Sequence, residues 1–111
     1  VYLHIEASDE AGHDGDLALK LKTIENLDRR IVKPVYEEVS QWDEPVCITI
    51  LPDHPTPVET RAHANEPVPF IVWYPGITSD SVYQYDEVSA LSGSYGLLKS
   101  HQLMTLLMAK Q

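Results

Sequence analysis

Apolar residues recur every three or four positions between Leu17 and Trp42, which is the period of one face of a helix. This face consists of Leu17, Leu21, Ile24, Leu27, Ile31, Val35, Val39 and Trp42. Asp16 stands just before it, where an acidic group interacts favourably with the helix dipole. Pro34 interrupts the pattern, and a proline ring clashes with the carbonyl four residues earlier. We therefore predict a helix with a kink or break near Arg30, whose apolar face packs into a core.

Three segments have the hydrophobic pattern of strands. In residues 1–7 the apolar side chains of Val1, Leu3 and Ile5 alternate with polar ones, as in a half-buried strand. Residues 46–51 form a short β-branched run of the kind found in buried parallel sheets. Residues 68–74 form a third strand, in which Pro69 indicates the start of pairing or an edge.

The remaining segments are polar connections and a second helix. A polar, glycine-containing loop is expected over residues 7–16, and a proline-rich loop from Pro52 to about Glu66. Residues 75–87 are expected to be irregular, and 88–92 to form a short helical turn. The spacing of leucines in residues 97–109 predicts a terminal helix, with Leu103, Leu106 and Leu107 facing inward.

The order strand, helix, strand, strand, helix predicts an α/β protein. With 111 residues the chain is long enough for one small domain, which we take as residues 1–111. It opens within an expected strand and without an initiator Met, whereas first residues are usually frayed. We therefore expect a fragment of a longer protein.

The amino-acid composition argues against two classes of binding partner. Seventeen acidic residues against eight basic ones give a formal net charge of -9, which argues against nucleic acid and against an anionic membrane surface. No apolar run approaches the roughly 18 residues of a membrane-spanning helix. Cys47 is the one cysteine and cannot form an internal disulfide, so a reducing, cytoplasmic location is expected.

Two loops concentrate side chains that can bind metal. Asp9 and His13 follow the first expected strand, and Asp53 and His54 directly follow the second, with His63 nine residues beyond His54. Sites in open α/β sheets gather at the carboxyl ends of strands. Carboxylates with imidazoles suit a divalent ion such as Mn²⁺ or Zn²⁺, and five ligands can divide over two ions.

A plainer interpretation of the same residues stays open at this point. Asp and Gly are common in loops for reasons of turn geometry, and a single His is more often a surface residue than a ligand. His4 lies in an expected strand and His101 on the expected terminal helix, so we interpret both as structural or orienting residues.

Four motifs resemble the cofactor-independent phosphoglycerate mutases, most closely their archaeal-type branch within the alkaline phosphatase superfamily. They occur in the family's order over nearly the whole chain, at residues 9–15, 24–28, 53–57 and 62–69. The resemblance implies part of a three-layer α/β/α sandwich with a mostly parallel sheet. It also implies interconversion of 2- and 3-phosphoglycerate through a phosphoserine, with two divalent ions, usually Mn²⁺ and otherwise Mg²⁺ or Zn²⁺.

Carried over by motif, the resemblance implies that Asp9, His13 and His63 bind one ion and that Asp53 and His54 bind the other. Pro55 stands where the family usually has a small residue. Nothing matches the family's nucleophilic Ser, its Asp ligand or its substrate-binding insertion. The chain therefore resembles the C-terminal part of the phosphatase-like domain, with metal ligands but no catalytic nucleophile.

Neutral imidazole ligands need hydrogen-bond acceptors that fix their tautomers, and Glu6, Glu10 and Glu66 are candidates. The metal ligands alone do not separate a mutase from a homoserine kinase-like phosphotransferase or from a metal-dependent phosphatase or sulfatase. An inert structural fragment is the alternative of another class. For the isolated 111 residues we expect no turnover, and we expect self-association through exposed apolar surface.

Overall fold

The structure is a computed structural model that describes residues 1–109. The chain divides into two compact units. The first contains Val1–Gln41 and His54–Glu66, and the second contains Trp42–Asp53 and the described chain from Pro67 onward. The long loop after the first strand therefore belongs to the helical unit, although both strands belong to the other.

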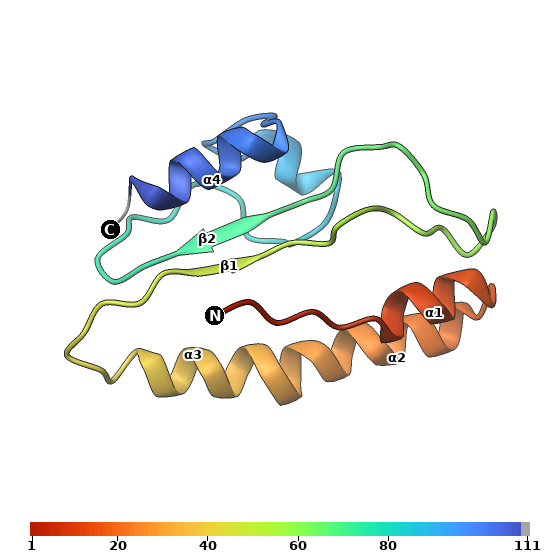
Figure 1. Cartoon of the computed structure of the whole chain (residues 1–111), viewed down its shortest axis with the longest axis horizontal. Helices are drawn as coiled ribbons and strands as arrows, with labels where there is room; N and C mark the ends of the chain where they lie inside the picture. Colours follow the sequence, from red (N-terminus) through yellow and green to blue (C-terminus); the bar gives the residue numbers. More distant parts are fainter. Residues whose placement is uncertain (110–111) are drawn as a thin grey trace. The chain divides into compact units, whose positions relative to one another are not determined.

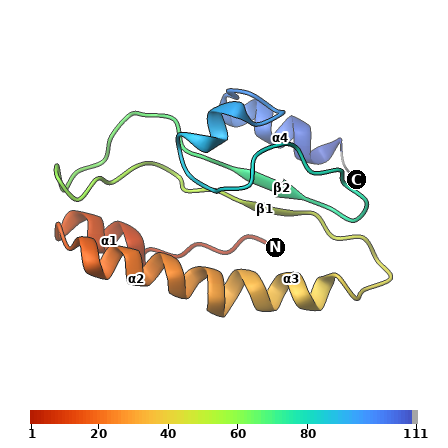
Figure 2. The same ribbon diagram turned by 180° about the vertical axis from the view of Figure 1, so that it is seen from behind.

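Two short helices pack side by side in the first unit. Helix α1 (Ala7–His13) lies along helix α2 (Leu17–Leu27), as Figures 1 and 2 show from opposite sides. The chain reverses between them at Gly15, whose φ of 67° lies in the left-handed region that glycine tolerates best. Asp16 caps α2, because its side chain accepts a hydrogen bond of 2.9 Å from the backbone N–H of Leu19.

The predicted break near Arg30 is confirmed. Helix α2 leads into a π-helical turn, η1 (Asp28–Val32), and then into α3 (Lys33–Val39), so that one rod runs through all three in Figure 1. Pro34 has no N–H to donate and its ring cannot approach the carbonyl of Arg30 closely. The wider π turn is the local adjustment that lets the helix continue past it.

The apolar face of this rod is mostly exposed, so the prediction that it forms a core is wrong for the described residues. Val39 is buried, whereas Leu17, Leu21 and Ile24 are 57%, 54% and 50% exposed. Helical periodicity identifies which face is apolar but carries no information about what covers it. The other buried hydrophobic residue of this unit, among the described residues, is Ala11 on α1.

The predictions for residues 1–13 are also wrong, whereas residues 14–16 form part of the expected loop. Residues 1–6 form no strand in the described chain, and residues 7–13 are the helix α1 rather than a loop. Alternating side chains favour a strand only where a neighbouring strand supplies hydrogen bonds, and residues 1–6 pair with none. Asp9 and Glu10 occupy the first turn of α1, where their negative charges stabilise a helix.

The second unit contains a two-stranded sheet. Strand β1 (Ile48–Ile50) pairs with β2 (Ile71–Trp73) in antiparallel register, with Thr49 opposite the buried Val72. Both strands were predicted, over longer ranges, but the expectation of a mostly parallel sheet is wrong for this pair. Short β-branched runs indicate burial and not direction, and the connection between these strands contains no crossover helix.

The end of the described chain follows the prediction more closely. Residues 75–87 are irregular, a 3₁₀ turn η2 covers Ser89–Ser92, and helix α4 covers Ser100–Met108. Leu103, Leu106 and Leu107 are half-buried on α4, while Met104 and Met108 are more exposed. Within residues 1–109, no helix has the length and apolar character needed to cross a membrane.

Candidate metal centre

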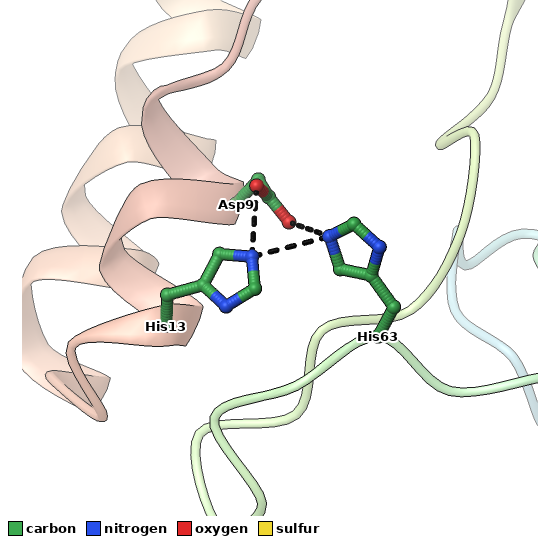
Figure 3. A group of neighbouring side chains, drawn as sticks. All are labelled: Asp9, His13 and His63. Atoms are coloured by element: carbon green, nitrogen blue, oxygen red, sulfur yellow. Dashed lines mark hydrogen bonds and ion pairs between the residues drawn. The ribbon is translucent and has the colours of Figure 1, made fainter.

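Three predicted ligands come together in the first unit. Asp9 and His13 are four residues apart on α1 and therefore lie on one helix face, and the loop that follows His54 brings His63 to them (Figure 3). The two imidazole Nε2 atoms are 3.1 Å apart. Asp9 completes the triangle, with one carboxylate oxygen 3.2 Å from Nε2 of His13 and the other 3.4 Å from Nε2 of His63.

The orientation of His13 is set by a backbone carbonyl. Its Nδ1–H donates a hydrogen bond of 2.9 Å to the carbonyl oxygen of Arg61, because a carbonyl can only accept. A neutral His13 therefore presents the lone pair of Nε2 to Asp9 and His63. Arg61 adopts a left-handed conformation with φ of 55°, which costs a residue with a side chain roughly 1–2 kcal/mol. The strained residue, Arg61, is therefore the one whose carbonyl orients His13, a predicted ligand.

The triangle of ligand atoms fits a small divalent ion. A lone pair of His13 that faces a carboxylate oxygen at 3.2 Å is repelled by it unless a proton or a cation lies between them. A tetrahedral ion with bonds of about 2.1 Å holds its ligand atoms about 3.4 Å apart. The Nε2–Nε2 distance of 3.1 Å is close to this value, and so are the distances of 3.2 and 3.4 Å, which the two imidazoles make to different oxygens of Asp9. One ligand atom can be taken from each residue so that all three lie within 4.8 Å of one another. One carboxylate and two imidazoles are also a ligand set that suits zinc and manganese.

Asp9 is held in its charged form by its neighbours. The hydroxyl of Thr56 donates a hydrogen bond of 2.5 Å to its carboxylate and is the main reason why the pKa of Asp9 lies below its ordinary value. Partial burial acts in the opposite direction, and the nearby imidazoles, His13 first, lower the pKa further. Asp9 is therefore ionised near neutral pH and can act only as an acceptor or a ligand.

The remaining two predicted ligands divide between the units. The ring of His54 lies against that of His63, with centroids 3.6 Å apart, and its Nδ1 is 3.3 Å from the hydroxyl of Thr56. Asp53 is the last residue of its segment in the second unit. The structure thus groups four of the five predicted ligands within one unit, and Asp53 is joined to them through its peptide bond with His54.

Sequence reasoning missed the groups that orient the imidazoles. The expected acceptors were Glu6, Glu10 and Glu66. In the structure, His13 is hydrogen-bonded to the Arg61 carbonyl instead, and His54 contacts the Thr56 hydroxyl. A backbone carbonyl has no signature in the sequence, whereas a Thr between two prolines beside a predicted ligand was a usable signal. His4 and His101 are exposed, and neither belongs to the cluster found among the described residues.

The chain matches one protein family and is similar to several named enzymes. The sequence pattern that describes the Metalloenzyme superfamily matches residues 1–110. The chain is 46% identical over 109 residues to a 2,3-bisphosphoglycerate-independent phosphoglycerate mutase of Methanothrix thermoacetophila, covering 98% of this chain and 28% of the relative. It is 48% identical over 108 residues to the enzyme of the same name from Methanosarcina barkeri, covering 96% of this chain and 27% of the relative.

A solved structure shows the same fold. A protein from Pyrococcus horikoshii superposes with a TM-score of 0.89 at 32% sequence identity, over 98% of this chain and 32% of that protein. The chain therefore spans about a quarter to a third of the length of the proteins it matches. The resemblance drawn from the four motifs is confirmed by these comparisons.

Proposed function

Because the chain belongs to the Metalloenzyme superfamily, we propose that it supplies most of a divalent-metal centre to a phosphoryl-transfer enzyme. The observation that carries this proposal is the convergence of one carboxylate and two imidazole nitrogens, from α1 and a loop 50 residues away, on one point. When His13 is neutral, the lone pair of its Nε2 faces the Asp9 carboxylate, and a cation between the two atoms removes their repulsion.

In this proposal Asp9, His13 and His63 hold one ion, and Asp53 and His54 belong to the site of a second. The ions, Mn²⁺ in the first instance, neutralise the charge that spreads over a phosphoryl group during transfer. The residues of the chain keep their lone pairs aimed at one point: the Arg61 carbonyl fixes His13, and the Thr56 hydroxyl holds Asp9. Little reorganisation is then needed when substrate binds.

The reaction that we propose for the whole protein is the interconversion of 2- and 3-phosphoglycerate, a step of glycolysis. The phosphoryl group moves from one substrate hydroxyl to a serine and then to the other hydroxyl of the same glycerate. The names of the similar archaeal enzymes support this assignment. The four motifs contain no counterpart of the serine, so we propose that the isolated 111 residues bind metal without turnover.

The test is an assay of the whole protein that carries this sequence, with 3-phosphoglycerate and Mn²⁺. We expect 2-phosphoglycerate to form, and His54→Ala or His63→Ala to reduce the rate at least about a hundredfold, because each removes a metal ligand. His101→Ala is the matched control, since this exposed histidine on α4 should leave turnover near normal.

The substrate that the whole protein accepts distinguishes a mutase from a homoserine kinase-like phosphotransferase and from a metal-dependent phosphatase. Phosphorylation of homoserine by ATP, or release of inorganic phosphate from simple esters, in place of 2-phosphoglycerate formation would contradict the mutase assignment while preserving the metal centre. Near-normal turnover of His54→Ala at saturating Mn²⁺ would instead remove that residue from the centre.

A further inference from the structure

Thr56 is the one buried polar side chain among the described residues. It is 4% exposed, although it lies in a loop whose other residues are mostly accessible. A buried hydroxyl normally has hydrogen-bond partners, because an unsatisfied one costs roughly 1–3 kcal/mol. The partners of this hydroxyl are two predicted metal ligands, Asp9 and His54.

The backbone of Thr56 is held in place from three directions. Lys20 on α2 donates a hydrogen bond of 2.6 Å from Nζ to its carbonyl oxygen. Gly12 on α1 lies so close that a Cβ atom at that position would collide with the same carbonyl. Pro55 and Pro57 flank it in the chain, and a proline fixes its own φ and restricts the residue before it. The side chain of Thr56 therefore projects from a rigid base.

The number of protons on the hydroxyl decides the direction of its two hydrogen bonds. A hydroxyl has one proton to donate and two lone pairs to accept with. That proton goes to Asp9, because an ionised carboxylate can only accept, and the 2.5 Å distance is typical of a bond from a hydroxyl to a charged oxygen. The contact of 3.3 Å with His54 must then run from Nδ1–H of the imidazole to the Thr56 oxygen.

We propose that Thr56 is a positioning residue that orients Asp9 and holds His54 as the tautomer protonated on Nδ1, so that the lone pair of the neutral ring, which is the electron pair that binds metal, is on Nε2. This inference rests on the proposed function only in naming a divalent ion as the ligand. Asp9 is expected to bind one ion and His54 the other, so the hydroxyl of Thr56 links a ligand of each metal site. Removing that hydroxyl should disturb both residues at once.

The first test measures the tautomer without any metal. In the 111-residue protein, labelled with ¹⁵N and treated with a chelator, long-range ¹H–¹⁵N spectra at about pH 8.5 report which nitrogen of each neutral imidazole carries the proton. We expect Nδ1 of His54 to be protonated in the wild-type protein and in Thr56→Ser, which retains a hydroxyl. Thr56→Val keeps a similar shape without the hydroxyl, and should show exchange between both tautomers.

The second test measures Mn²⁺ binding by calorimetry in the same proteins. Loss of a group that orients a metal ligand typically weakens binding about 10- to 100-fold, which we expect for Thr56→Val, whereas Thr56→Ser should stay within about threefold. Thr60→Val is the matched control, because the hydroxyl of this exposed threonine of the same loop makes long contacts, of 3.4 Å to the Pro57 carbonyl and 3.5 Å to the Ala62 carbonyl, and none to a predicted ligand. It should change neither the tautomer nor the affinity.

The outcomes separate this inference from the function on which it rests. A wild-type His54 protonated on Nε2 overturns the positioning role, even if Thr56→Val does not fold and even if Mn²⁺ binds normally. A Thr56→Val protein that folds and binds Mn²⁺ as the wild type does overturns it as well. Failure of the wild type to bind Mn²⁺ contradicts the proposed function, whereas the tautomer measurement still decides the role of Thr56.

Discussion

The surroundings of Asp9 in the first unit differ from those of Asp80 and Asp86 in the second. In the second unit, Asp80 accepts hydrogen bonds from the backbone N–H groups of Val82 and Ser94, and Asp86 accepts one from the backbone of Ser89 and one from its hydroxyl. These carboxylates close turns. In the first unit, the carboxylate of Asp9 receives the Thr56 hydroxyl but otherwise faces imidazole nitrogens.

The comparison shows that a low carboxylate pKa does not by itself identify a functional site. The pKa values of Asp9, Asp80 and Asp86 are all lowered, and in each case a hydrogen bond is the largest cause. What distinguishes Asp9 is the type of group around it. Backbone N–H groups satisfy a carboxylate oxygen, whereas imidazole nitrogens, which have a lone pair when they are not protonated, can hold a cation beside it.

The largest predicted effect is the loss of Mn²⁺ affinity when the charge of Asp9 is removed. Asp9→Asn removes the negative charge at the centre of the imidazole cluster and should weaken Mn²⁺ binding to the 111-residue protein at least about a hundredfold. Asp80→Asn is the matched control, since it should weaken only the turn that Asp80 closes and leave the Mn²⁺ affinity unchanged. Calorimetry on both variants measures the difference, and equal Mn²⁺ affinities of the two variants would contradict the distinction between Asp9 as a ligand and Asp80 as a turn residue.

The same titration of the wild-type chain should show unequal sites. Asp9, His13 and His63 offer three ligand atoms within 4.8 Å of one another, whereas Asp53 and His54 supply only two residues. We expect one tight site and a second that is weak or not detected, because fewer protein ligands make a site less preorganised. Two equally tight sites would contradict the division of ligands.

The next effect concerns glycines, which also differ between the units. A Cβ at Gly12 would collide with the Thr56 carbonyl, whereas a Cβ at Gly76 meets nothing within 4 Å and is opposed only by its φ of 83°. Gly12→Ala should lower the free energy of unfolding by about 1–3 kcal/mol through overpacking, despite the better helix propensity of Ala. Gly76→Ala should cost roughly 1 kcal/mol and leave Mn²⁺ binding intact. Urea unfolding measures both.

These elements also show how far the sequence can be interpreted. Period and proline placement predicted the rod from α2 to α3 and its break near Arg30, because both features are local. The helix α1 was missed, since its polar residues and glycine were interpreted as a loop, although Asp9 and His13 have a spacing that a helix brings together. The antiparallel pairing of β1 and β2 depends on the path of a 20-residue connection, which no local pattern encodes.

The candidate site was predictable in its ligands but not in their supports. Residue types and the four motifs named Asp9, His13 and His63, which the structure brings together from positions up to 54 apart. The Arg61 carbonyl could not be predicted, because every residue has a carbonyl and only the fold decides which one faces His13. The Thr56 hydroxyl depends on burial, which a proline-rich loop does not suggest.

A smaller effect is expected on association. The exposed apolar face of α2, with Leu17, Leu21 and Ile24, is the surface through which we expect the chain to self-associate at high concentration. Leu21→Glu should weaken a dimer about tenfold, or roughly 1.4 kcal/mol, by placing a charge in the contact. Lys22→Glu, which adds more negative charge at the neighbouring exposed position, should weaken it less. Light scattering over a concentration series measures both, and a strictly monomeric wild type would contradict the expectation.

The smallest predicted effect concerns Tyr85, a residue of the second unit whose hydroxyl has a structural role. The Tyr85 hydroxyl lies 3.0 Å from the carbonyl oxygen of Pro69 and 3.3 Å from that of Ile50, and so ties the segments beside β1 and β2 together. Burial, and then the negative charge of Glu87, raise the pKa of Tyr85 to about 12. An unfolded tyrosine has a pKa of about 10, so between these two values the unfolded chain has lost the proton that the folded chain retains. The free energy of unfolding should therefore fall as the pH rises from about 10 to about 12, whereas below about pH 10 the Tyr85 contribution is fully present.

Tyr85→Phe should be slightly less stable at pH 8, because the hydrogen bonds are lost, and should show a flatter decline above pH 10. Urea unfolding at a series of pH values checks both parts, and an equally steep decline in Tyr85→Phe would assign it to other groups.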